Sequence, residues 1–169
     1  MTEQQPYTVV STHAGFEIRE YPAYVLIQVD VVGDFMSAGN MAFSPLVRYI
    51  SGNNDAGARM AMTAPVIQET VQGKHHTVSF VLPAGMDPKS LPLPKDARVR
   101  TTPVDTHRAA ARKFGGGWNE KRFKENGEAL LAGVRGAGLQ TDGDIYYARF
   151  DPPWKPGFLK KNEALIRLV

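Results

Sequence analysis

Hydrophobic residues in the first third of the chain alternate with their neighbours in the way a half-buried β-strand requires. In the stretch PAYVLIQVDVV, every second residue from Val25 to Val31 is β-branched, which predicts a strand covered on at least one face. The preceding stretch, YTVVSTHAGFEIREY, predicts two strands joined by a turn at His13 to Gly15. Two further strands are expected in RMAMTAPVIQET and HHTVSFVL, with VQGK as the hairpin turn between them.

A helical period interrupts these strands between Asp34 and about residue 50. Asp34 is a suitable N-cap, and one stripe of the helix should face the sheet. That stripe consists of Phe35, Gly39, Ala42, Phe43, Leu46 and Ile50. Met36 and Val47 widen it on one side. Pro45 cannot donate a hydrogen bond to the carbonyl four residues earlier, so we expect the helix to kink or to restart with Ser44 as a new cap.

The same order of elements returns in the second half of the chain. Extended segments in ARVRTTPVDTHRAAARKF precede a helix in NEKRFKENGEALLAGVRGAG, and strands follow in GDIYYARF and NEALIRLV. The apolar stripe of this second helix consists of Phe123, Gly127, Leu130, Leu131 and Val134. A shift of 83 positions places one helix on the other, which indicates an internal pseudo-repeat of roughly 7–83 and 97–169.

Each predicted half has one sheet face and one helix to cover it. Two such halves predict an α+β fold, a distorted and mostly antiparallel β-barrel or sheet of two pseudo-symmetric halves flanked by two main α-helices. A length of 169 residues suits one domain, 1–169, with a substantial core.

Composition narrows the classes of function. Twenty basic and seventeen acidic residues give a net charge of +3, and because the basic residues are scattered we expect no nucleic-acid partner. The absence of cysteine excludes disulfides, thiolate metal sites and cysteine nucleophiles. No apolar run approaches the ~18 residues of a membrane span and the N-terminus does not resemble a signal peptide, so we expect a cytoplasmic protein without a span.

Catalytic and metal-binding motifs are weak. The chain has no G-x-S-x-G, no phosphate-binding loop and no dinucleotide fingerprint in a suitable context. His75 and His76 are adjacent on a predicted strand, so their side chains point to opposite faces and cannot share one metal. His13 and His107 are expected to be surface or hydrogen-bonded histidines, and they are weak candidates for a contact with heme iron.

Two short stretches leave alternatives open. In RMAMTAPV, Met60 and Met62 share one face of the predicted strand, where they are either soft ligands or, as we favour, core residues. The stretch FDPPWKPGF surrounds Trp154 with stiffening prolines, and we expect this loop to plug one end of the sheet rather than to contact a ligand.

The first helix offers the best binding clue. Met36, Met41 and Val47 add apolar surface beyond its core stripe, and Arg48 stands beside Val47. Flexible thioethers next to an arginine suit a flat apolar ligand that carries a carboxylate. The alternative is a wide core face with a stray methionine.

Several segments, in order and spacing, resemble the SOUL/p22 heme-binding protein family, in its bacterial-type single-domain form. They are FEIREYPAYVLIQV, LVRYISGNND, RMAMTAPV, VSFVLP, LPLPKDARV, ARKFGGGW and YYARFDPPWKPGFLKKNEALI, and they span roughly residues 7–166. The resemblance implies a distorted barrel of two similar halves with two helices. It also implies reversible binding of heme or protoporphyrin in an apolar groove beside the first helix.

Carried over on YISGNND, the resemblance places the groove at Phe43, Val47 and Arg48, with the arginine near the propionates. Asn40 stands where some members have a second basic residue, and Met36 and Met62 complete the candidate site. The histidine proposed as an axial ligand in some members has no clear counterpart here. The expected cofactor is therefore non-covalent heme b or protoporphyrin IX, with the metal ligand unknown.

The resulting hypothesis is a monomeric tetrapyrrole-binding protein that buffers or transports its ligand or delivers it to a protein acceptor. We expect a binding protein rather than an enzyme. One alternative is a heme-processing enzyme that releases iron, in which Met62, His107 or Tyr24 would contribute. Another is a small-molecule effector module of the kind found in bacterial regulators.

Overall fold

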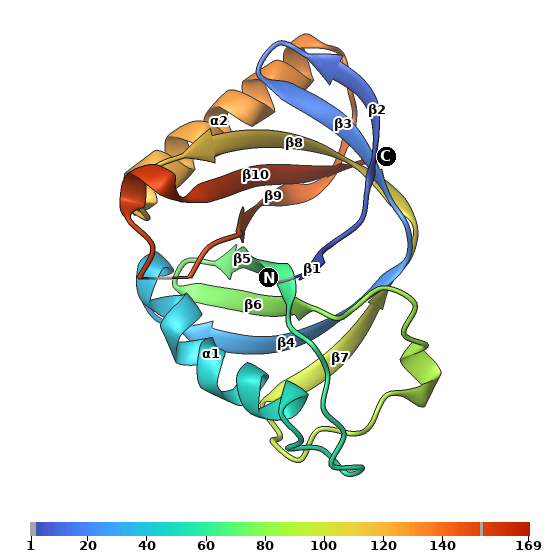
Figure 1. Cartoon of the computed structure of the whole chain (residues 1–169). Helices are drawn as coiled ribbons and strands as arrows, with labels where there is room; N and C mark the ends of the chain where they lie inside the picture. Colours follow the sequence, from blue (N-terminus) through green and yellow to red (C-terminus); the bar gives the residue numbers. More distant parts are fainter. Residues whose placement is uncertain (1–2, 153) are drawn as a thin grey trace. The chain divides into compact units, whose positions relative to one another are not determined.

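The computed structural model describes residues 3–152 and 154–169, and within these ranges the architecture is α+β. Its strands are β1 (Glu3–Gln4), β2 (Thr8–His13), β3 (Phe16–Tyr21), β4 (Tyr24–Val32), β5 (Thr63–Gln72), β6 (His75–Val81), β7 (Val99–Val104), β8 (His107–Gly115), β9 (Thr141–Arg149) and β10 (Lys161–Leu168). Its helices are α1 (Phe35–Ile50) and α2 (Glu120–Gly136), with 3-10 turns η1 (Pro88–Ser90) and η2 (Gly157–Leu159) (Figure 1). None of the helices within the described ranges is long and apolar enough to cross a membrane.

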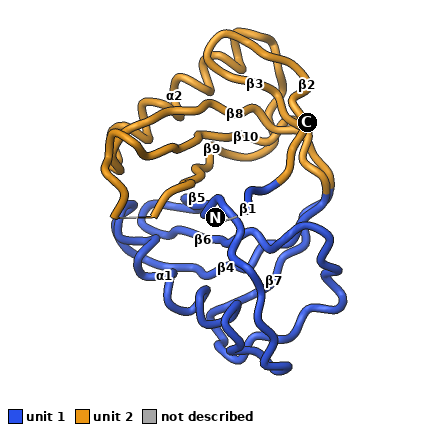
Figure 2. Tube along the Cα trace, viewed as in Figure 1, with its two compact units in different colours: residues 1–5, 23–105 blue, residues 6–22, 106–169 orange. Residues whose placement is uncertain are grey.

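The chain separates into two compact units, each assembled from two stretches of sequence (Figure 2). Unit 1 contains Ala23–Asp105 and the residues up to Gln5, and its strands lie in the order β5-β6-β4-β7. Unit 2 contains Pro6–Pro22 and Thr106–Val169, in the order β2-β3-β8-β10-β9. The pairings within the units are antiparallel, except that β1 runs parallel to β5.

The strand orders match the sheet form of the predicted fold rather than the closed-barrel form. β7 is the terminal strand of the order in unit 1 and β2 is that of unit 2, and among the described residues no pairing joins these two strands. The predicted mostly antiparallel α+β fold with two main helices is confirmed. The pseudo-repeat of 7–83 and 97–169 stays a prediction.

In unit 1, α1 packs on β4 and β6, and it buries four of the six residues of the predicted stripe together with three that were not predicted. Its buried residues are Phe35, Ala38, Ala42, Pro45, Leu46, Tyr49 and Ile50. Phe43, expected in the core stripe, is 48% exposed. The small Ala38 and Ala42 let the helix approach the sheet, and the Tyr49 hydroxyl donates to the Pro92 carbonyl at 2.8 Å. A hydrophobicity pattern favours the large Phe43 over the small Ala38 and the hydroxyl-bearing Tyr49, which explains why Phe43 was wrongly expected in the core.

Two other expectations for this region need correction. The helix does not restart at Ser44 but continues through Pro45, so the missing hydrogen bond is tolerated inside the helix, and the alternative of a kink at Pro45 stays a prediction. The strand predicted from Arg59 begins only at Thr63, and the Ala64–Pro65 peptide bond near its start is cis. Met60 and Met62 therefore precede the strand, where both are partly buried against the hydrophobic core of unit 1. This packing is consistent with the favoured interpretation that both methionines are core residues.

In unit 2, α2 buries the predicted face. The Asn119 side chain caps the helix by accepting a hydrogen bond from the Arg122 amide at 2.7 Å. Four residues of the predicted stripe are buried, namely Phe123, Gly127, Leu130 and Val134. Leu131 is partly buried and packs against the same core, which also contains Phe16 and Ile18 of β3. The helical period is clear here because large apolar residues mark it.

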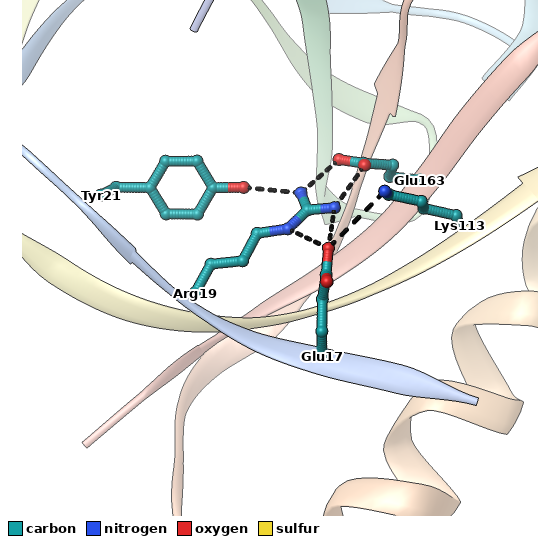
Figure 3. A network of polar contacts seen from close by, with 5 residues as sticks. All are labelled: Glu17, Arg19, Tyr21, Lys113 and Glu163. Carbon is teal, nitrogen blue, oxygen red and sulfur yellow. Dashed lines mark hydrogen bonds and ion pairs between the residues drawn. The ribbon is translucent and has the colours of Figure 1, made fainter. Parts of the chain in front are cut away.

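The opposite side of β3 carries a buried polar network that the sequence did not indicate (Figure 3). Arg19 donates to both carboxylate oxygens of Glu163 on β10, at 2.7 and 2.6 Å, and to the Tyr21 hydroxyl at 2.9 Å. Its Nε donates to Glu17 at 2.9 Å, and Lys113 lies 3.8 Å from the same Glu17 oxygen. The bidentate geometry is that of a strong arginine–carboxylate pair.

Arg19 is the most deeply buried cation of this network. Its side chain is 0% exposed, and its guanidinium lies 4.0 Å from the centre of the Tyr7 ring. Burial alone would lower the pKa of Arg19, but the hydrogen bonds and charges of Glu163 and Tyr21 raise it above its usual value. The guanidinium therefore stays charged inside the fold, held by its oxygen partners.

Candidate functional site

One stripe of α1 runs beside its buried face and remains accessible. Met36, Asn40, Phe43 and Val47 follow one another at steps of four, three and four residues, which places them on one side of the helix. Asn40 and Phe43 are exposed, whereas Met36 and Val47 are partly buried. We call these four residues the α1 flank. The structure thus brings together four of the six residues predicted to bind the cofactor.

The exposed aromatic of the α1 flank is anchored on the sheet. The Phe43 ring meets the Phe80 ring of β6 edge to face, with centroids 5.8 Å apart. Phe80 pairs in register with Val66 of β5, and Val66, Val47 and Met62 all pack against the core that contains Phe80. Met62 therefore packs against the same apolar core as Val47 of the flank, although it does not lie on a strand.

Arg48, the predicted propionate contact, stands in the last turn of α1, and its side chain is exposed. Its charge contributes, after the larger effect of Arg98, to lowering the pKa of Asp96 to about 2. Arg98 accounts for most of that shift because it donates to both carboxylate oxygens of Asp96, at 3.0 and 2.7 Å. Asp96 is consequently ionised at neutral pH, and it is an anion whose charge interacts with that of Arg48.

Further cations gather around the end of α1, and the helical pattern could not reveal them. The amide of Asn53 donates to the Arg48 carbonyl at 2.8 Å, the Lys95 amide donates to the Asn53 carbonyl, and Ser51 forms a β-bridge with Arg59. Four exposed basic residues are thus carried by adjoining backbone, namely Arg48, Arg59, Lys95 and Arg98. We call them the basic rim. Three of them come from loops beyond the helix, so only the fold assembles the set.

A buried asparagine fixes the loop that builds this rim. The Asn54 side chain is 0% exposed and donates to the carbonyls of Tyr49 and Ala58, at 3.0 and 2.9 Å. It also accepts from the Ala58 amide at 2.9 Å. The bond to Tyr49 supplies a partner to a carbonyl of the last helical turn, and the two bonds to Ala58 close the loop that follows. The motif SGNND therefore forms the turn that reverses the chain after α1.

The candidate histidines and the α1 flank belong to different units. His13 and His107 are in unit 2, whereas the flank is in unit 1. His13 is 3.0 Å from the Ser11 hydroxyl and stacks on Phe16, and His107 stacks on Tyr21. His76 of unit 1 is buried, with its two ring nitrogens at 3.0 Å from the Thr70 hydroxyl and from the Gly33 carbonyl. In the described part of the chain, no group of three or more histidine or acidic side chains could hold a metal ion.

The loop FDPPWKPGF does not bury its tryptophan as expected. Trp154 is 83% exposed and Phe158 is 82% exposed, so neither ring plugs the sheet; Pro153 lies outside the described residues. The prolines stiffen the loop, but they do not determine which way its aromatic rings face.

Comparisons with known proteins agree with the fold. The family model described as SOUL heme-binding protein matches residues 2–167. Heme-binding protein 1 of Mus musculus is 30% identical over 132 residues, which cover 74% of this chain and 68% of that protein. Heme-binding protein 1 of Xenopus laevis is 28% identical over 160 residues, 89% of this chain and 82% of that protein.

Among solved structures, the EcmrR C-terminal domain superposes with a TM-score of 0.69 over 96% of this chain and 98% of that one. The two sequences are 14% identical, so this likeness concerns the fold alone.

Proposed function

Because this chain belongs to the SOUL heme-binding protein family, we propose that it binds heme b or protoporphyrin IX non-covalently on the α1 flank, to buffer, carry or deliver the tetrapyrrole. One observation carries the choice of this surface. The exposed Phe43 ring packs on Phe80, lies beside the apolar cluster that contains Val47 and Met62, and is on the same helix as Arg48 of the basic rim.

The chemistry of the ligand suits this arrangement. A porphyrin has two apolar faces and carries its two propionates at one edge, so its site needs an apolar wall that ends in cations. Burial of about 300 Å² of apolar surface supplies roughly 7 kcal/mol at about 25 cal/mol/Å², before the entropic cost of association. Micromolar binding is therefore possible without an iron ligand.

This proposal predicts that the free base binds nearly as well as heme. Protoporphyrin IX should bind within about tenfold of heme, and Arg48→Glu should weaken both by about tenfold, because a propionate then meets a carboxylate. Absorption and fluorescence titrations of the purified protein measure both affinities.

The matched control is Arg135→Glu, since Arg135 is the exposed basic residue in the last turn of α2. It changes net charge equally and should leave both affinities unchanged. Strong heme binding without protoporphyrin binding would show that iron coordination carries the affinity. Equal losses in the two variants would refute the α1 flank as the site.

Removing the charge of Asp96 is expected to strengthen tetrapyrrole binding, the opposite of the effect of Arg48→Glu. Since its pKa is about 2, its carboxylate is charged throughout the neutral range and opposes propionates near Arg48. Asp96→Asn should strengthen binding of either tetrapyrrole by about two- to fivefold. The same titration at pH 7 measures it, with Asp142→Asn in unit 2 as the control. Weaker binding in Asp96→Asn would mean that Asp96 chiefly holds the rim in place.

A further inference from the structure

The loop between β9 and β10 exposes large apolar side chains at close spacing. Trp154 is 83% exposed, Phe158 82% and Leu159 49%, all within six residues. We call these three residues the aromatic tip. Side chains of this size are unfavourable in water when they are grouped, and grouped exposure usually marks a contact surface.

Hydrogen bonds hold the loop that carries the aromatic tip. The Asp151 carboxylate accepts from the Lys155 ammonium at 2.8 Å and from the Lys161 amide. The Leu159 amide donates to the Pro156 carbonyl at 2.9 Å, which closes the turn of η2. Gly157 lies so close to Gly117 that a side-chain carbon added at Gly157 would come within 3.2 Å of the Gly117 backbone. The loop is therefore fastened at its base while its aromatic side chains face outward.

Cations surround this end of unit 2. The Gly116 amide donates to the Lys160 carbonyl, and Arg122 donates to the Gly115 carbonyl, so the loop and the start of α2 lie together. Residues 115–125 and 149–161 contain seven basic and three acidic side chains, a net charge of +4 against +3 for the whole chain. The exposed or partly exposed basic residues are Lys121, Arg122, Lys124, Lys155 and Lys161. We call them the basic collar.

We propose that the aromatic tip and the basic collar dock on an anionic phospholipid membrane surface. Tryptophan and phenylalanine partition into the headgroup region, and lysines nearby are attracted by anionic lipids, so the two features reinforce each other. A second copy of this chain fits less well, because two ends with a charge of +4 would face each other. The aromatic tip and the basic collar contain no residue of the α1 flank, so membrane docking does not depend on tetrapyrrole binding.

The test is sedimentation of the full chain with vesicles of phosphatidylcholine alone or with about 20% phosphatidylserine. Binding to the phosphatidylserine vesicles should be at least about tenfold stronger, and salt at about 0.5 M should largely abolish this preference. The double variant Trp154→Ala/Phe158→Ala should lose at least about tenfold in binding. Tryptophan emission should shift to the blue with these vesicles in the wild type, and Trp154→Phe should remove the shift while Trp118 remains.

The control variant is Val71→Ala/Leu93→Ala, which removes two apolar side chains of unit 1 that are each 69% exposed. It should bind vesicles as the wild type does. Equal losses in the two double variants, or no binding by the wild type, would overturn the proposal. Concentration-dependent dimerisation that only Trp154→Ala/Phe158→Ala abolishes, without vesicle binding, would assign the tip to self-association instead.

Discussion

Replacing Arg19 by methionine is expected to lower the free energy of unfolding by about 3–5 kcal/mol. The substitution fills similar volume but leaves the Glu163 carboxylate, which is 5% exposed, without its bidentate partner. It also removes the cation that lies against the Tyr7 ring. The cost arises because a buried carboxylate that has lost its cation keeps most of its desolvation penalty.

Denaturant unfolding of the variants measures this loss. The control is Arg108→Met, because Arg108 of β8 and Glu20 of β3 form an exposed ion pair of 3.4 Å that also ties β3 to another strand. An exposed pair of this kind contributes at most about 1 kcal/mol. The double variant Arg19→Met/Glu163→Leu should recover much of the lost stability, since no charge is then left behind. Similar losses in the free energy of unfolding for Arg19→Met and Arg108→Met would contradict the claim that burial makes the loss of Arg19 costly.

Gly127→Ala should destabilise the protein by about 1–3 kcal/mol even though alanine favours helices. A methyl group at Gly127 would collide with the Tyr147 hydroxyl and lie 3.2 Å from Ile145 Cγ2. The Tyr147 ring cannot easily yield, because it also packs against Phe123 with centroids 5.4 Å apart. Burial raises the pKa of the Tyr147 hydroxyl to about 12, and Glu128 contributes a smaller effect. This shift agrees with the close packing of Tyr147 against α2.

The matched control lies at the end of the same helix. Gly136 has no heavy atom within 4 Å of the position of an added methyl group. Gly136→Ala should therefore raise stability by about 0.5–1 kcal/mol through helix propensity alone. Thermal or denaturant unfolding of both variants gives the comparison. An increase in both would mean that α2 is not seated as closely on β9 as the structure has it.

Local patterns predicted most of the elements because their signal is local. The stripe of α2 reflects burial on one face, and the alternation in β4 and β6 marks the side chains that enter the apolar core of unit 1, although both faces of these strands are largely buried. Each segment carries that information by itself. Failures occurred where small or polar residues do the packing, as with Ala38 and Tyr49 of α1. The start of β5 was also placed too early, since its first pairing depends on β6 and not on the stretch itself.

The residues of the candidate site are likewise only partly predictable from the sequence. Val47 and Arg48 could be selected from the helical pattern because one helix carries both, whereas Phe43, which that pattern places in the core, was selected only through the family resemblance. The basic rim could not be selected, because Arg59, Lys95 and Arg98 reach it through hydrogen bonds between loops. Arg19 and Glu163 are 144 residues apart, and no pattern along the chain relates them.

The division of each unit between distant stretches has a consequence for synthesis. During translation β2 and β3 emerge early, but the strand that Tyr21 must pair with begins at His107, so this hairpin waits until all of unit 1 has been synthesised. Its apolar side, with Phe16 and Ile18, has no core to join in that interval. Unit 1 can meanwhile assemble around α1, which suggests that nascent chains halted shortly after Asp105 expose this waiting hairpin to chaperones and proteases.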